Sequence, residues 1–187
     1  LNAAGMKSWV TPELKGDICL SFGQYLTPPT VTEEIRRTNA SRNIWITVPG
    51  NRPWSVTGMS AWQKAARWGM VSDELTVTGR PGAFTLANTN DVLGLSVKVT
   101  VFIPSSGEQV ELLLVEVENI SKQKVDFELT YAVPVFARHA DNFRDHRQVP
   151  TMFQQNYRDE HGVRVKPRII HDEHGHAPNH TGYLVYG

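Results

Sequence analysis

The sequence has little of what disulfide cross-linking, secretion or membrane insertion requires. Its 187 residues include one cysteine, Cys19, which cannot form a disulfide within the chain, so we expect a reducing, cytoplasmic compartment. No apolar run approaches the roughly 18 residues that a membrane helix needs. The chain starts without methionine and without a signal peptide, and it stops abruptly after a strand-like run. We therefore expect an internal fragment of a longer, multidomain protein.

The formal net charge is zero, because 19 basic residues balance 19 acidic ones. A neutral chain has no electrostatic reason to bind nucleic acid or an anionic membrane, so neither partner is expected. Hydrophobic residues make up 40% of the chain, which is enough for a core. The length suits one domain, and we assign residues 1–187 to a single one.

The dominant feature of the sequence is an alternation of apolar and polar residues with a period of two. It predicts long strands at Leu93–Ile103, Val110–Asn119 and Val125–Phe136, joined by short polar turns. Short turns favour an antiparallel meander in which these three strands are neighbours. Leu112–Val115 is apolar on both faces, which predicts a central strand covered on both sides.

Shorter runs of the same kind lie on both sides of this meander, separated by Gly and Pro. Further strands are predicted at Asp17–Phe22, Asn43–Val48, Leu75–Thr78, Ala83–Ala87, Val163–Ile170 and Gly182–Tyr186, with one short helix within Val149–Tyr157. Many antiparallel strands and little helix predict an all-β fold, an antiparallel two-sheet β-sandwich. We expect its buried residues to include Cys19, Val97, Val99, Leu112, Leu114, Phe127 and Leu129.

Tryptophans and a charged loop are the candidate contact residues. Packing is the favoured role of all five tryptophans, and Trp54, which follows Arg52 and Pro53 in a loop, is the better candidate for stacking on a sugar. Arg138–Arg147 follows the third long strand and is dense in both charges. We therefore take Arg144, Asp145, His146 and Arg147 as candidate cleft-edge or interface residues. A salt-bridged loop that fastens the end of the sheet is the favoured alternative.

The sequence contains no recognisable catalytic motif and no metal-binding motif. The histidine-rich segment His171–His180 has irregular ligand spacing and contains Gly, Pro and Asn, so it predicts a solvated hairpin connection without a native metal. The sequence has no Gly-rich phosphate loop, no nucleophile elbow and no carboxylate pair whose spacing assigns an acid and a base. We therefore expect no catalytic residue and no cofactor in this chain.

Several stretches, taken in order, resemble a known family. They are Gly16–Ser21, Arg36–Trp45, Arg52–Thr57, Val110–Asn119 followed by Ser121, Asp141–Arg147 and Asn179–Tyr183. Together they resemble the N-terminal β-sandwich, of the supersandwich or galactose mutarotase-like type, of glycoside hydrolase family 94. This family contains the cellobiose phosphorylase-like enzymes, and the 1,2-β-oligoglucan phosphorylase branch is the most similar. The resemblance spans nearly the whole chain.

The resemblance implies a non-catalytic domain of an inverting glycoside phosphorylase. Such enzymes cleave β-glucosidic bonds, here in β-1,2-glucooligosaccharides, with inorganic phosphate as co-substrate and release α-glucose 1-phosphate. The catalytic acid belongs to a downstream (α/α)6 barrel, and the sandwich helps to form a homodimer interface and the active-site entrance. An independent carbohydrate-binding module and a sandwich domain of a related hydrolytic glycosidase remain as alternatives.

Overall fold

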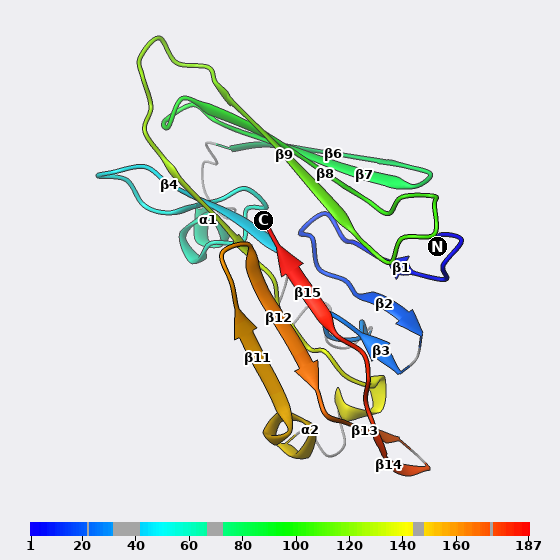
Figure 1. The fold of residues 1–187 in the computed structure, drawn as a ribbon. Helices are drawn as coiled ribbons and strands as arrows, with labels where there is room; N and C mark the ends of the chain where they lie inside the picture. The colour runs from blue at the N-terminus through cyan, green and yellow to red at the C-terminus, as the bar shows by residue number, and fades with distance from the viewer. Residues whose placement is uncertain (22, 32–41, 67–72, 144–147, 173) are drawn as a thin grey trace.

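The protein is a mostly β structure built from several antiparallel sheets, seen here in a computed structural model (Figure 1). The structure describes residues 1–187 except 22, 32–41, 67–72, 144–147 and 173. Its helical elements are short: α1 (Ala61–Ala66), the 3-10 turn η1 (Ala140–Phe143) and α2 (Gln148–Met152). None of the helices among the described residues is long and apolar enough to cross a membrane.

Strands make up the rest of the regular structure. The first half contains β1 (Lys7–Ser8), β2 (Ile18–Ser21), β3 (Gln24–Tyr25), β4 (Asn43–Thr47), β5 (Trp54–Ser55), β6 (Asp73–Arg80), β7 (Ala83–Asn90) and β8 (Leu95–Phe102). The second half contains β9 (Leu112–Asn119), β10 (Glu128–Ala132), β11 (Gln154–Arg158), β12 (Gly162–Pro167), β13 (Ile169–Asp172), β14 (Gly175–Pro178) and β15 (Tyr183–Tyr186).

The main core lies between two sheets that pack face to face. One is the four-stranded sheet in the order β6-β7-β8-β9, and the other is the three-stranded sheet in the order β10-β4-β5. Figure 1 shows β4 passing beneath the four-stranded sheet. Side chains from both sheets form one buried cluster: Leu14, Ile44, Ile46, Trp54, Val56, Leu86, Leu93, Leu95, Val97, Val99 and Val101. The expected all-β, sandwich-like architecture is therefore confirmed.

A second group of sheets extends the structure away from this core. It consists of the sheets β1-β2-β3 and β11-β12-β15 and the hairpin β13-β14. Figure 1 shows β15, in red, running from this group back toward the four-stranded sheet. Ala137, Val165 and Tyr183 form a smaller buried cluster in the second group.

The alternation in the longest strand is confirmed, but its predicted neighbours are only half correct. In β8, Val97 and Val99 are fully buried and Lys98 is exposed, and β8 pairs with β9 in unbroken register. The third strand does not join β9: only Glu128–Ala132 is extended, and it pairs with β4 in the opposite sheet. The polar turn after β9 reverses the chain as predicted. The next strand, β10, then pairs with the free edge of β4 and not with β9.

Four of the residues that we expected to be buried are exposed. Leu112 and Leu114 lie on the face of the sheet opposite to the buried Val99 and Val101, and Leu114 is 54% exposed. The expected central strand covered on both sides was therefore wrong, because only the core-facing side of β9 is covered. Phe127 and Leu129 are each 40% exposed, since the four-stranded sheet ends at β9 and does not reach over them.

Three local predictions also need correction. The helix α2 ends at Met152, and the residues after it form β11, which pairs with β12. The run Val163–Ile170 is divided between β12 and β13 at Arg168, whose amide donates to the carbonyl of Phe153. The short helix α1 was not predicted. The strands predicted around residues 17, 43, 75, 83 and 182 are present, with shifted ends.

Candidate functional site

Trp54 is not available for stacking on a sugar, because its side chain is fully buried. The preceding Arg52 and Pro53 are exposed, but the chain then turns inward and Trp54 pairs with Ile46 of β4. The indole of Trp62 donates to the carbonyl of Pro53 at 3.0 Å and closes this turn. The packing role is therefore correct for Trp54, and the surface role is wrong.

The other four candidates, Arg144, Asp145, His146 and Arg147, lie outside the described residues. The segment before them is well anchored. The amide of Asp141 donates to Nδ1 of His139 at 3.2 Å, and the side chain of Asn142 donates to the carbonyl of His171 at 3.0 Å. The first contact is local to η1, and the second fastens η1 to β13.

The histidine-rich segment forms that hairpin. His171 and His176 are paired across its strands, and their ring centres lie 4.5 Å apart. In the part of the chain that the structure describes, no group of three or more His, Cys, Asp or Glu side chains could hold a metal ion.

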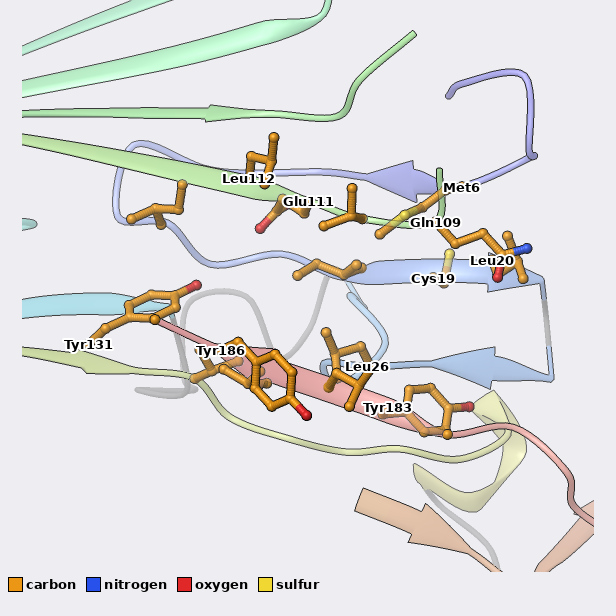
Figure 2. A pocket seen from close by; sticks show the side chains of 18 of the residues that line it. Met6, Cys19, Leu20, Leu26, Gln109, Glu111, Leu112, Tyr131, Tyr183 and Tyr186 are labelled. Carbon is orange, nitrogen blue, oxygen red and sulfur yellow. The ribbon is translucent and has the colours of Figure 1, made fainter. Parts of the chain in front are cut away.

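An apolar groove of about 620 Å³ lies beside β9. Figure 2 shows its wall formed by the β9 segment, by β2 and by β15, with Tyr131 at one end. The lining residues come from distant parts of the sequence: Met6, Ile18–Leu20, Gln24, Leu26, Gln109–Leu113, Val115, Leu129, Tyr131, Val133 and Thr181–Gly187. We call this the β9 groove.

The groove is open because the two layers of the sandwich do not end at the same place. Leu113 and Val115 point from β9 toward the core side and pack against the buried cluster. On the opposite layer Leu129, Tyr131 and Val133 alternate along one face of β10 and the residues after it. The described residues contain no strand beyond β9 in the four-stranded sheet. The face that carries Leu129, Tyr131 and Val133 is therefore only partly covered.

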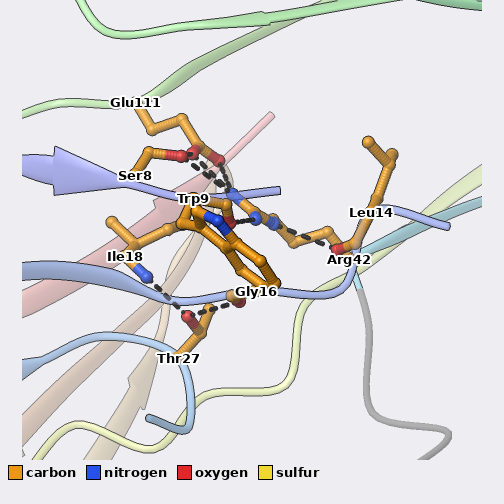
Figure 3. A network of polar contacts seen from close by, with 8 residues as sticks. All are labelled: Ser8, Trp9, Leu14, Gly16, Ile18, Thr27, Arg42 and Glu111. Atoms are coloured by element: carbon orange, nitrogen blue, oxygen red, sulfur yellow. Dashed lines mark hydrogen bonds and ion pairs between the residues drawn. The ribbon is translucent and has the colours of Figure 1, made fainter. Parts of the chain in front are cut away.

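A buried ion pair closes one wall of the groove (Figure 3). Nη1 of Arg42 donates to Oε1 of Glu111 at 2.6 Å, and the side chains of both residues are almost completely buried. Arg42 also donates to the carbonyls of Trp9, at 2.8 Å, and of Leu14. Ser8 donates to the second oxygen of Glu111. The pair therefore ties the N-terminal segment and the start of β4 to the segment that enters β9.

Backbone geometry explains one glycine next to this network. Gly16 has φ +131°, and a Cβ atom there would lie 1.9 Å from the carbonyl oxygen of Trp9. Only glycine permits this approach, which brings Trp9 close to the chain that leads into β2.

Several titratable groups on the groove wall have raised pKa values, Tyr131, Cys19, Tyr183 and Tyr186 among them. Burial raises the pKa of Tyr131 to about 12, and the nearby Glu111 carboxylate adds to the shift. Burial also raises the pKa of the Cys19 thiol, with a further contribution from Asp17, so the thiol stays protonated at neutral pH. Tyr131 and Cys19 are both neutral under ordinary conditions.

The groove is therefore suited to binding apolar surface and not to acid–base chemistry. Its wall is largely aliphatic and aromatic, and the carboxylate of Glu111 is already bound by Arg42 and Ser8. Sequence reasoning missed Arg42, Glu111 and Tyr131. The signal available was weak: a charged residue beside an apolar strand, as in Val110-Glu111-Leu112.

Comparison with known proteins adds no assignment. No protein-family model matches this chain, and no curated protein matches it.

Proposed function

We propose that this chain is the non-catalytic β-sandwich domain of a cytoplasmic inverting glycoside phosphorylase that cleaves β-glucosidic bonds, with β-1,2-glucooligosaccharides as the favoured substrates. Its role in the whole enzyme is structural. It provides a scaffold on which a downstream (α/α)6 barrel, and a second subunit in a homodimer, are positioned.

One observation supports this proposal most: three of the six stretches that resemble the family contribute residues to the walls of the β9 groove. Gly16–Ser21 contains β2, Val110–Asn119 contains β9, and Asn179–Tyr183 leads into β15. Arg42, in a fourth stretch, binds Glu111 on the same wall. The resemblance therefore includes an exposed apolar surface, which is a feature typical of contact sites between domains or subunits.

The proposed reaction explains why a domain without a catalytic constellation is useful. In inverting cleavage a carboxylic acid protonates the leaving oxygen while the nucleophile attacks from the opposite face of the sugar. Phosphate is already anionic, so it needs positioning and charge neutralisation more than a base. A rigid sandwich can hold the entrance of such a cleft without supplying the acid.

Burial of Trp54 weakens the alternative of an independent carbohydrate-binding module, because an indole must be exposed to stack on a sugar ring. Trp9, which is 46% exposed, remains available for such a contact. A hydrolytic relative would use the same sandwich, so the assay has to separate phosphorolysis from hydrolysis.

The test is the release of α-glucose 1-phosphate from β-1,2-glucooligosaccharides and from cellobiose, with and without phosphate. We expect activity from a longer protein that includes the barrel and none from residues 1–187. Substituting Arg144 or His146 in that longer protein should change assembly or substrate affinity more than the chemical step. Activity of residues 1–187 alone would contradict the proposal. Release of free glucose without phosphate would favour the hydrolase, and β-glucan binding by residues 1–187 would favour the binding module.

A further inference from the structure

The two edges of the four-stranded sheet differ in how well they are protected from pairing with another strand. The edge strand β6 has acidic residues at its start and Gly79-Arg80 at its end, which are features that discourage edge pairing. The edge strand β9 carries Glu116 and Glu118 in its second half, but its first half, Leu112–Val115, consists of four consecutive apolar residues. Both edge strands pair with their neighbours in unbroken register. Such a flat, apolar edge is a template for one more strand.

The surface beside this edge has the periodicity of a strand. Leu129, Tyr131 and Val133 follow one another at intervals of two on the floor of the groove, and the β15 residues Leu184 and Tyr186 border it. A strand added to β9 would extend the four-stranded sheet over this floor. Its alternate side chains would then point into the groove, because successive side chains of a strand lie on opposite faces.

We propose that the β9 groove is the docking site of one additional β-strand, which pairs with the free edge of β9 and becomes the fifth strand of the four-stranded sheet. The proposal rests on the proposed function, and its occupant is a segment of the longer polypeptide outside residues 1–187. Sheet extension supplies main-chain hydrogen bonds, and the pockets of the groove supply side-chain selectivity.

The chemistry of the occupant follows from the two faces of β9. Toward the groove, the carboxylate of Glu111 is neutralised by Arg42, so the inward side chains should be apolar. On the outer face of β9, the exposed Leu112 and Leu114 come first and the exposed Glu116 and Glu118 follow. Lys98 lies 2.7 Å from Glu116. Opposite charges on facing strands attract, so the outward side chains that face Glu116 and Glu118 should be basic. The occupant is therefore an extended segment with apolar inward residues and with basic outward residues beside the second half of β9.

A peptide experiment tests this directly on residues 1–187. The probe is a nine-residue peptide of alternating valine and lysine, added at up to about 1 mM, the range in which weak complexes form. The readout is amide hydrogen exchange. We expect the β9 amides that point away from β8 to exchange at least about 10-fold more slowly, as amides do when they become hydrogen-bonded. Added salt should weaken the effect, because the outward contacts are exposed ion pairs.

Matched controls make the result specific. A peptide of the same composition with valines and lysines in separate blocks should give no protection, and one with glutamate in place of lysine should give less. Leu129→Asp should abolish protection by placing a charge on the groove floor. Leu75→Asp on β6, where the leucine is exposed to a similar extent (38% against 40%), should not.

Three outcomes would overturn the proposal: no protection of β9, protection of β6 instead, or equal protection by the block peptide. A fourth is protection of β9 without peptide that rises with protein concentration, since the occupant would then be a second copy of the chain. None of these outcomes depends on glucose 1-phosphate release. Peptide docking in a protein whose longer form has no phosphorylase activity would instead refute the proposed function alone.

Discussion

Strands β8 and β9 are neighbours with the same alternating pattern, yet one lies over a closed core and the other over an open groove. Val97 and Val99 of β8 are fully buried, because β4 and β5 cover them from the opposite sheet. Leu113 and Val115 of β9 face the same side but are only half-buried. The comparison teaches that alternation determines which face of a strand turns inward, whereas the opposite layer determines how much of that face is covered.

The polar contacts of the two regions differ in the same way. Asn43, at the start of β4, accepts hydrogen bonds from Ser55 and Thr57 at 3.0 Å each, within one short stretch of the core. Arg42, the preceding residue, binds Glu111 across 69 residues of sequence. Of these two neighbouring residues, Asn43 therefore makes local, neutral contacts in the core, and Arg42 makes a long-range, charged contact at the groove wall.

The largest difference should appear between two tryptophans. Trp54→Ala in the core should lower the free energy of unfolding by about 3–5 kcal/mol, since it removes a fully buried indole and leaves a cavity. Trp9→Ala, near the groove wall, should cost about 1–2 kcal/mol, because about half of that side chain is already in water. Urea unfolding measures both values. Equal losses would mean that the two regions are equally closed.

The ion pair should give the next largest effect. Arg42→Met should cost about 3 kcal/mol, because it leaves the buried Glu111 carboxylate without a countercharge. The double variant Arg42→Met with Glu111→Leu should recover much of this loss, since no charge then remains buried. Unfolding of both variants in parallel provides the measurement. A double variant no more stable than Arg42→Met would show that the unpaired Glu111 carboxylate is not the cause of the loss.

Ile46 of β4 and Leu129 of β10 are paired across the two strands, so they allow the effects of burial on stability to be compared at adjacent positions. Ile46→Ala should cost about 2–5 kcal/mol, since Ile46 is fully buried. Leu129→Ala should cost about 1 kcal/mol in residues 1–187, because Leu129 is 40% exposed. If a strand fills the groove in the longer protein, the cost of Leu129→Ala should rise there. The same cost in both forms would argue against coverage of the groove.

The sequence predicts the strands better than their partners, for a physical reason. Alternation in Leu93–Ile103 reports the burial of a face, and the polar turn after Asn119 reports a chain reversal; both are local signals. Neither specifies that Glu128–Ala132 joins β4, because that choice depends on which sheet edge is free elsewhere. The Arg42–Glu111 contact was missed for the same reason, and Trp54 was misplaced because its inward turn is set by pairing with β4.

Tyr131 gives the smallest and most local test, because it packs against the core cluster and also lines the groove. Burial, followed by the Glu111 carboxylate, raises its pKa to about 12 from an ordinary value of 10.0, so the folded state favours the neutral phenol. The resulting stabilisation is fully present below pH 10 and is lost as the pH rises toward 12.

The free energy of unfolding should therefore decline above pH 10, by at most about 1.4 kcal/mol per pH unit for each buried tyrosine. Tyr131→Phe should make that decline shallower than in the unsubstituted protein. Chemical unfolding at a series of alkaline pH values measures both slopes. A slope that Tyr131→Phe does not change would mean that water reaches this end of the groove. A phenol pKa that rises further when the alternating peptide is added would show that the strand excludes that water.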